Sequence, residues 1–240
     1  RYSDNAIQAV GVACSRDPDL ASGNHSWVAQ DVPLDCSADA AGTVLNVGPG
    51  SSLTLGPDLV LLSGGVEVRG RIDVNGTSSR QVRFGPATGS ARPGDWSGLA
   101  LYNATGSISG ANVTCASTGI TLANSSLPIR ETTVTNSEYD GLRCQGSSQP
   151  VVTTCQFANN GRHGVLIENT ARPNLGDLGP VTTADDGRNC FSGNAQYDVY
   201  NATANRILAQ GNWWPSADEA AIGARVYDQA DDSRRGKVDF

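Results

Sequence analysis

The residues best suited to acid–base chemistry are an aspartate and a histidine, each placed just before a glycine. Asp140 precedes Gly141, and His163 precedes Gly164, 23 residues later. A carboxylate beside an imidazole raises the pKa of that imidazole and fixes its tautomer. With Arg143 close in sequence, this group could remove the proton alpha to the carboxylate of a uronate. Asp140, His163 and Arg143 are therefore the candidate catalytic residues.

The same region also fits two simpler interpretations. Glu138, Arg162 and Tyr200 are the candidate ligand-binding residues, since they could hold a sugar by hydrogen bonds without any chemical step. The other interpretation is a solvated turn with ordinary charges. Catalysis, ligand contact and solvated surface all remain open at the level of the sequence.

Acidic side chains in two segments suggest calcium as a cofactor, and no other cofactor is expected. The candidate metal ligands are Asp177, Asp185 and Asp186, whose oxygens could face a calcium ion although their spacing is not that of an EF-hand. A second acidic group lies near the end of the chain and comprises Asp228, Asp231 and Asp232. Arg234 and Arg235 follow it and are expected to form ion pairs with it.

The six cysteines indicate disulfides rather than a metal centre. No CxxC pair occurs and the chain has 2 histidines, which excludes the common zinc and iron–sulfur spacings. Cys14 with Cys36 could close a local loop, and Cys144 and Cys155 are also close in sequence. Spacing leaves the pairing open, since six cysteines allow about 15 connectivities. Disulfides would place the protein in an oxidising, secreted or cell-surface location, whereas buried free thiols are the alternative.

A repeat of about 22 residues decides the expected fold. The glycines Gly98, Gly119, Gly141 and Gly164 are separated by 21, 22 and 23 residues, and each begins an alternating apolar–polar segment. A fifth copy follows 34 residues later with Asp198 in place of the glycine, so residues 169–188 are expected to form an inserted loop. We expect each glycine to accommodate a tight corner that requires a positive φ.

Short strands of this kind bury a face only when equivalent strands stack, at roughly 4.8 Å per coil. The expected first interior ladder is Leu99, Ile120, Leu142, Val165 and Val199. The second is Leu101, Leu122, Cys144 and Ile167, and a third is Val113, Val134, Phe157 and Phe191. The alternating residues that would face outward are Ala100, Thr121, Arg143, Leu166 and Tyr200. This column has no carboxylate, which argues against a paired-carboxylate hydrolase on this strand.

The sequence therefore predicts an all-β chain folded as a single-stranded parallel β-helix. Shorter alternating segments between residues 43 and 84 would form its first coils. Residues 1–40 do not fit the repeat and are expected to be an N-terminal cap or extension, which leaves 41–240 as the β-helix domain. A capping segment is expected over 215–240, where Ser216 and Glu219 have the spacing of a capping box before residues 220–226.

Several motifs resemble bacterial secreted and cell-surface proteins with the right-handed parallel β-helix fold, in the pectin-lyase-like group. They are residues 53–55, 66–77, 82–84, Gly94-Asp-Trp-Ser-Gly98, residues 189–194 and 197–203, and Gln210-Gly-Asn-Trp-Trp214. The resemblance covers about residues 43–240 and implies a right-handed solenoid with polysaccharides or cell-surface glycans as partners. Pro215 stands where the family usually has a glycine. These motifs specify the fold far more than the activity.

The charge balance and hydropathy exclude two classes of function. The net charge of -7 does not provide the basic surface of a nucleic-acid-binding protein, and no apolar stretch reaches the length of a membrane span. We expect a non-catalytic extracellular module for adhesion, carbohydrate binding or structural assembly. The alternative is a polysaccharide lyase, glycoside hydrolase or epimerase that uses Asp140, His163 and Arg143. End-to-end self-association through the coil ends is a third hypothesis.

Overall fold

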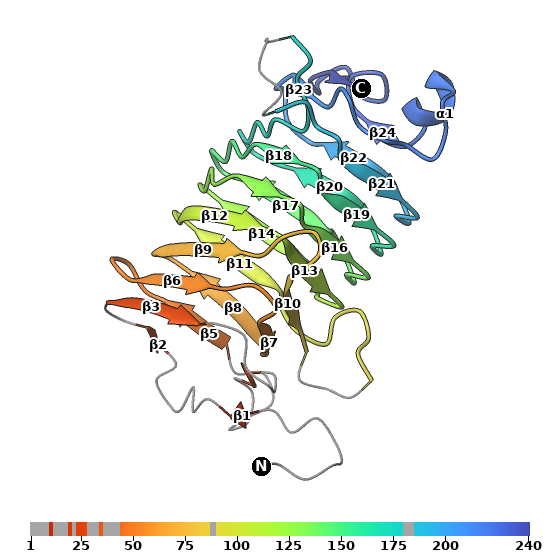
Figure 1. Cartoon of the computed structure of the whole chain (residues 1–240). Coiled ribbons are helices and arrows are strands. Elements are labelled where there is room, and N and C mark those ends of the chain that lie inside the picture. Colours follow the sequence, from red (N-terminus) through yellow and green to blue (C-terminus); the bar gives the residue numbers. More distant parts are fainter. Residues whose placement is uncertain are drawn as a thin grey trace.

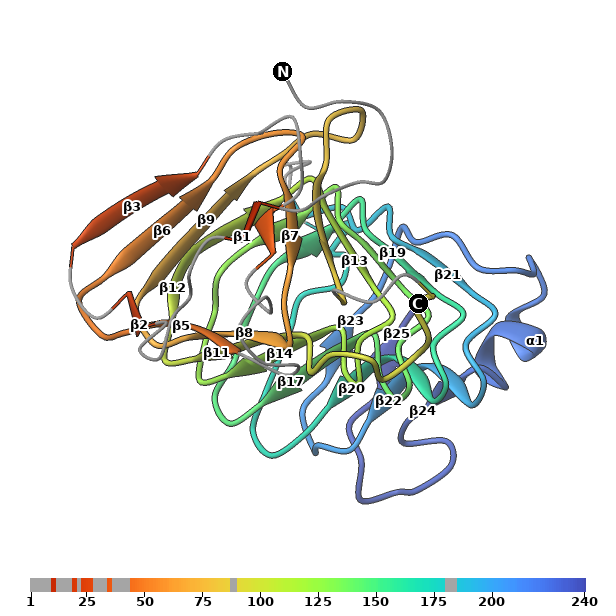
Figure 2. The same ribbon diagram turned by 90° about the horizontal axis from the view of Figure 1, so that it is seen from below.

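The computed structural model describes residues 10–11, 19–20, 23–27, 34–35, 44–86, 90–179 and 185–240. Within this part of the chain, short strands stack into three main parallel sheets that run the length of the molecule (Figure 1). The end-on view shows that the sheets form the sides of a three-sided solenoid (Figure 2).

The strands fall into sheets by their position in the repeat. Sheet B contains β2 (Asp19–Leu20), β5 (Val44–Val47), β8 (Gly65–Val68), β11 (Leu99–Tyr102), β14 (Ile120–Ala123), β17 (Leu142–Gln145), β20 (His163–Ile167), β22 (Tyr197–Asn201) and β24 (Val226–Tyr227). Sheet C contains β3 (Asn24–Trp27), β6 (Ser52–Leu55), β9 (Arg71–Asn75), β12 (Thr105–Ser109), β15 (Ile129–Arg130) and β18 (Val152–Thr153). Sheet A contains β1 (Val10–Gly11), β4 (Leu34–Asp35), β7 (Val60–Leu62), β10 (Val82–Gly85), β13 (Ala111–Thr114), β16 (Thr133–Thr135), β19 (Gln156–Ala158) and β21 (Cys190–Ser192).

The chain visits the sheets in the fixed order B, C, A and then rises to the next coil. Near the C-terminus, Asn174 bridges both Val151 and Leu208, and Cys190 bridges Trp213, so sheets C and A continue through isolated residues. The strand β23 (Ile207–Leu208) then pairs with β25 (Val238–Asp239). The expected insertion at 169–188 therefore contains a residue of sheet C, with 180–184 outside the described residues.

The interior ladders lie in the expected register. Leu99 pairs with Ile120, which pairs with Leu142, and the series continues through Val165 to Val199. The second ladder pairs Leu101, Leu122, Cys144 and Ile167, and all of these side chains are buried. The outward column is also in the expected register, but it continues below Ala100 to Glu67 of β8. The five predicted positions from Ala100 to Tyr200 carry no carboxylate, and Glu67, the next position below them, forms an ion pair with Arg69.

Aromatic rings close the upper part of the core. Phe157 and Phe191 are neighbours in sheet A with ring centroids 5.7 Å apart, and Trp214 stacks on Phe191 at 4.7 Å. Offset ring pairs of this kind add to the stabilisation from burial. The adjacent Trp213 is 58% exposed, so the two tryptophans have different roles.

The repeat glycines are required for a different reason from the one predicted. Gly98 has a φ of +99°, but Gly119, Gly141 and Gly164 do not have positive φ. At Gly141, an added Cβ would lie 2.7 Å from the carbonyl oxygen of Gly164 in the next coil. Close approach of the neighbouring coil, rather than backbone conformation, therefore excludes a side chain at most of these positions.

The described residues at the two ends pair with or pack beside the regular coils. The strands β2, β3 and β4 pair in parallel with β5, β6 and β7, so the described parts of residues 1–40 continue the sheets. At the other end, helix α1 (Glu219–Gly223) forms beside β24, and its N-cap is Asp218 rather than Ser216.

Candidate functional site

The structure brings Asp140 and His163 together at one corner of the solenoid. Asp140 lies just before β17, and His163 begins β20 in the next coil, where its carbonyl accepts a hydrogen bond of 2.9 Å from the N–H of Gly141. Asp140 is fully buried and its Oδ2 accepts a 2.6 Å hydrogen bond from Nη2 of Arg162. The guanidinium of Arg162 also lies over the ring of Tyr139 at 5.2 Å. The pairing partner of Asp140 is thus Arg162.

Burial changes the expected chemistry of the histidine. His163 is only 5% exposed, and this burial lowers its pKa below the usual range. Arg162 lowers the pKa further, whereas Asp140 and Glu168 oppose the shift without reversing it. The neighbouring carboxylate of Asp140 does raise the pKa of His163, as predicted, but desolvation of the charged imidazole outweighs this attraction and the net shift is downward.

Three polar atoms at this corner have no hydrogen-bond partner among the described residues. They are Oδ1 of Asp140, Nε of Arg162 and Nδ1 of His163. Buried polar atoms without partners are costly, so such atoms identify a place where polar groups converge. Of the features at this corner, these three free polar atoms most favour a role in acid–base catalysis.

Two other candidates lie apart from these contacts. Arg143 faces outward from β17 and its Nε donates to Oε2 of Glu168 at 2.6 Å. Glu138 is exposed, and its carboxylate lies next to Gly94 in the loop before β11. The predicted grouping of Arg143 with Asp140 is therefore not seen among the described contacts.

The outer face of sheet B carries a cluster of rings around Tyr200. Tyr200 and Tyr227 stack with centroids 4.3 Å apart and planes at 3°, and His163 stacks on the other side of Tyr200 at 4.7 Å. Tyr197 packs edge-on against both tyrosines, at 5.6 Å and 5.5 Å. Burial raises the pKa of Tyr200, and its hydrogen bond with Tyr227 acts in the same direction. We call His163, Tyr197, Tyr200 and Tyr227 the ring cluster.

Sequence reasoning identified Tyr200 but missed Tyr227 as its partner. Tyr227 lies 27 residues after Tyr200 and pairs with it in register, since β24 is one coil above β22. Tyr227 was missed because its strand, β24, has only two residues, which is too short to show an alternation of apolar and polar side chains. The signal that could have found it is the Val-Tyr spacing shared by residues 199–200 and 226–227.

The comparisons with known proteins concern the fold. A family model described as a right-handed β-helix region matches residues 97–206, which is just under half of the chain. No curated protein and no solved structure gave a match. The family match supports the parallel β-helix family, and it spans the region that holds Asp140, His163 and Tyr200.

The three carboxylates of the inserted segment each have a different partner. Asp177 accepts from the N–H of Gly179 at 2.9 Å, Asp185 from Asn174 at 3.1 Å, and Asp186 forms an ion pair of 3.1 Å with an arginine. Among the described residues, no three His, Cys, Asp or Glu side chains are grouped as a metal site. The insertion therefore shows no calcium site in its described part.

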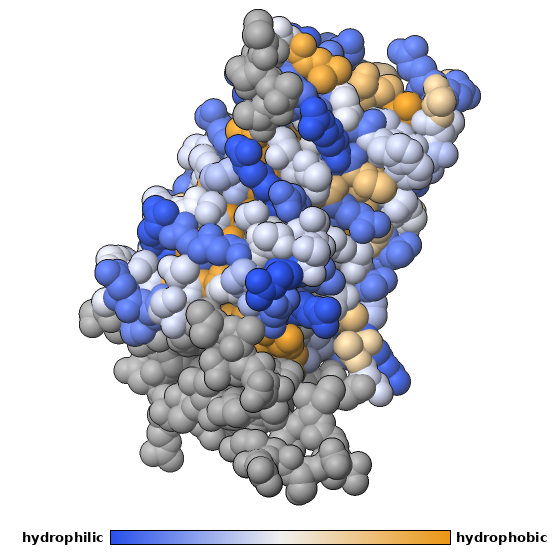
Figure 3. Space-filling view, viewed as in Figure 1, coloured by the Kyte–Doolittle hydropathy of each residue, from blue (hydrophilic) through white to orange (hydrophobic). Residues whose placement is uncertain are grey.

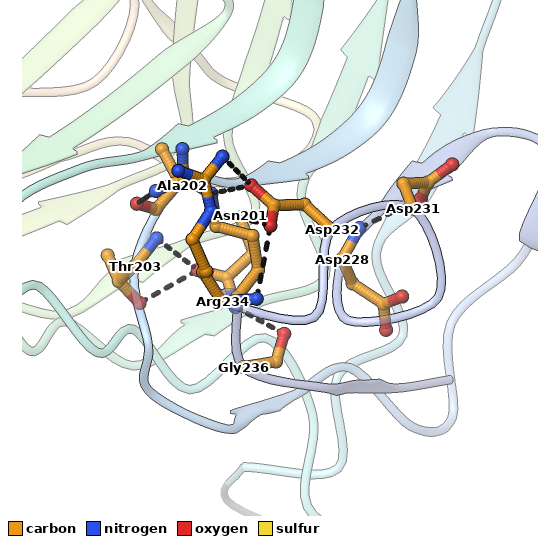
Figure 4. Close-up of polar contacts among 9 residues, drawn as sticks. Asn201, Ala202, Thr203, Asp228, Asp231, Asp232, Arg234 and Gly236 are labelled. Atoms are coloured by element: carbon orange, nitrogen blue, oxygen red, sulfur yellow. Dashed lines mark hydrogen bonds and ion pairs between the residues drawn. The ribbon is translucent and has the colours of Figure 1, made fainter.

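The carboxylates of the second acidic group form ion pairs and hydrogen bonds with nearby residues at the end of the chain (Figure 4). Asp232 pairs with Arg234 at 2.9 Å and with Arg235 at 3.3 Å, as expected. Asp228 accepts hydrogen bonds from the backbone N–H groups of Ala230 and of Val238 in β25, and Asp231 accepts one from the N–H of Asp228. These contacts fix the loop between β24 and β25 rather than leave oxygens free for an ion.

The described cysteines are free thiols. Cys144 and Cys155 are both buried but belong to different sides of the solenoid, and Sγ of Cys155 lies 3.2 Å from the carbonyl of Thr153. The predicted involvement of these two cysteines in disulfides is therefore not found. Burial raises the pKa of Cys155 to about 12. Cys14 and Cys36 lie outside the described residues.

Helix α1 has five residues, and in the described part of the chain no helix has the length and apolar character needed to cross a bilayer.

Proposed function

We propose that this protein is a non-catalytic, secreted or cell-surface β-helix module that binds carbohydrate on the outer face of sheet B. The observation that carries this proposal is the ring cluster of His163, Tyr197, Tyr200 and Tyr227. The three half-buried tyrosine rings pack on one another, and Tyr200 packs on the buried ring of His163, which gives an amphipathic surface on a rigid support.

The chemistry of the cluster suits a sugar. A pyranose ring has apolar C–H faces and a rim of hydroxyl groups, and tyrosines offer apolar ring area together with a hydroxyl. The three tyrosines are half-buried, so part of each ring is held by packing while the rest faces solvent. Arg143, which lies next to Leu166 in the outward column, forms an ion pair with Glu168. A ligand could therefore contact the exposed parts of the rings and form hydrogen bonds with the hydroxyl and charged groups next to them.

The polysaccharide-active enzyme is the second candidate. It is favoured by the unpartnered atoms of Asp140 and His163, which lie at one corner. A general base must come within hydrogen-bond reach of the proton that it removes. Asp140 is fully buried and tied to Arg162, and the imidazole of His163 is covered by the tyrosine rings, so a substrate would have to displace these neighbours. This requirement is the reason that binding is the first candidate.

Glycan-array binding of the full chain, followed by calorimetry with the best ligand, tests the proposal. We expect Tyr200→Ala and Tyr227→Ala each to raise the Kd at least tenfold. Tyr139→Ala is the matched control, because Tyr139 is 43% exposed and lies outside the ring cluster. Binding that both cluster variants leave unchanged would refute the proposed face. Release of sugar product, lost in His163→Ala, would favour the enzyme.

A further inference from the structure

One buried aspartate at the C-terminal end of the solenoid differs from the others in its partners. Four aspartates are buried in the part of the chain that the structure describes. Three of them form ion pairs, and these are Asp140 with Arg162, Asp198 with Arg225, and Asp239 with Arg206 and Lys237. The fourth, Asp228, is 6% exposed and forms no ion pair among the described residues. A buried carboxylate is rarely left without an opposite charge, so Asp228 needs an explanation.

The hydrogen bonds of Asp228 do not supply that charge. Its two oxygens accept from the N–H groups of Ala230 at 2.8 Å and of Val238 at 2.7 Å. These donors are neutral, so they satisfy the oxygens and leave the negative charge uncompensated. The N–H of Asp228 donates to Oδ2 of Asp231 at 3.1 Å, which holds a second carboxylate in the same loop (Figure 4). Asp231 is exposed and, within the described ranges, also forms no ion pair.

Both carboxylates line a hollow at the end of the solenoid, which we call the end hollow. Its volume is about 540 Å³, which is enough for a small organic molecule. Most of its lining is apolar and comes from Gly223, Ala224, Val226, Ala230, Val238 and Phe240. Apolar side chains gather at this end of the molecule in the space-filling view (Figure 3), where Figure 1 places α1 and the C-terminus.

The end hollow has a hydrocarbon floor and an aromatic wall. Val226 and Val238 are each at most 2% exposed, and Val226 extends the first interior ladder because it pairs with Val199. Phe240 remains 38% exposed, although its ring packs edge-on against Trp214 with centroids 6.0 Å apart. The face of an aromatic ring attracts a cation that lies within about 6 Å of its centre. Floor, wall and carboxylates together suit a ligand with an apolar body and a positive charge.

The residues of the end hollow do not themselves provide a cation for Asp228. Among the described residues that line it, Lys237 is the one basic side chain, and its ammonium lies 3.0 Å from Asp239. A metal ion would need a shell of several oxygens. No three His, Cys, Asp or Glu side chains are grouped in this way in the described part of the chain. An organic cation needs only a free lone pair on one or both carboxylates, together with apolar contact.

We propose that the end hollow binds an organic ammonium ion with an apolar body. The ammonium would lie between Asp228 and Asp231 and beside the ring of Phe240, and would donate charge-assisted hydrogen bonds to the carboxylates. The hydrocarbon body would lie on Val226 and Val238. Asp228 would then have the opposite charge that the other three buried aspartates have. The ring cluster contributes no residue to this lining, so the inference does not depend on the proposed function.

Titration of the ¹⁵N-labelled full chain with octylammonium, 1-octanol and octanoate tests the proposal, because the three probes share a hydrocarbon chain and differ in charge. We expect octylammonium to shift the amide signals of Ala230, Asp231 and Val238. It should bind at least tenfold more tightly than octanol, and octanoate should bind more weakly still. Equal affinity for octylammonium and octanol, or tighter binding of octanoate, would overturn the proposal. Octylammonium shifts that are absent from these amides, or confined to residues 197–201, would also overturn it.

Variants that remove one charge test the two carboxylates. Asp231→Asn should raise the Kd of octylammonium at least threefold and leave that of octanol unchanged, since its amide oxygen can still accept from the N–H of Asp228. Asp228→Asn should raise the Kd at least tenfold. Asp218→Asn is the matched control, because Asp218 lies outside the lining and asparagine is an equally good N-cap for α1.

The Asp231 variant keeps the test decisive if Asp228→Asn disturbs the loop, because Asp231 is exposed. An unchanged Kd of octylammonium in Asp231→Asn would contradict the proposal. An equal rise in the Asp218→Asn control would contradict it as well, since the effect would then come from net charge alone.

Discussion

Replacement of Gly141 by alanine tests the packing of one coil on the next. An added Cβ would lie 2.7 Å from the carbonyl oxygen of Gly164 and 2.7 Å from Nδ2 of Asn160, whereas ordinary contact begins at 3.4 Å. Neither neighbour can move easily, because one is backbone and the other is a buried amide bonded to Asn194 at 2.9 Å. Overpacking of a close-packed interior costs about 1–3 kcal/mol.

The gain from a stiffer unfolded chain offsets part of this cost, since a compatible Gly→Ala change stabilises by about 0.4–1 kcal/mol. We therefore expect a net loss of about 1–2 kcal/mol, which corresponds to a Tm about 2–8 °C lower for a chain of this size.

Urea unfolding followed by tryptophan fluorescence measures the difference directly. Gly85→Ala is the matched control, because a Cβ there would meet only a methyl group of Thr114 at 3.9 Å. The control should be slightly more stable than the wild type. If the Gly141 and Gly85 variants unfold at the same urea concentration, successive coils do not approach each other closely at Gly141.

Three further outcomes follow from the packing and the titrations. Phe191→Ala should lower the free energy of unfolding, measured with urea, by about 3–5 kcal/mol because the ring is enclosed in the aromatic stack. Trp213→Ala should change it by no more than about 0.5 kcal/mol because Trp213 is exposed. Equal effects of the two variants would contradict the assigned stack. Since burial lowers the folded-state pKa of His163, its contribution to stability should be complete above about pH 6.5 and decline as the pH falls towards the folded value. His163→Gln should therefore flatten the decline below pH 6.5, and an unchanged pH profile would argue against a buried imidazole. Maleimide should label Cys144 and Cys155 only after unfolding, as read by mass spectrometry; rapid labelling in the native state would contradict their burial.

The regular part of the fold was predictable because its signals are local and repeated. Alternation around Leu99, Ile120 and Leu142 gave both the strand positions and their vertical register, since a shift by one residue would turn an apolar column outward. The ends were harder to predict. The strand at Asn24–Trp27 pairs with β6 but belongs to no recognisable copy of the repeat, so its place depends on tertiary pairing.

The candidate site was predictable in position and less so in chemistry. The repeat correctly placed Asp140 next to His163, but their burial depends on how much the adjacent coil covers them. Arg162 became the partner of Asp140 through the one-coil offset, whereas Arg143, closer in sequence, points to the outer face. Sequence separation is a poor guide in a solenoid, where the nearest neighbour of a residue is usually about 22 positions away.

The most direct test of a binding role is to incubate the full chain with insoluble and soluble polysaccharides and measure retention and product in the same samples. The panel includes neutral and acidic polymers, with and without calcium, and reads new reducing ends together with the absorbance of unsaturated uronates. We expect retention on at least one polymer with no product above the level without protein. Product release by the wild type that disappears in a folded His163→Ala variant would contradict a non-catalytic module and assign chemistry to the corner of Asp140 and His163.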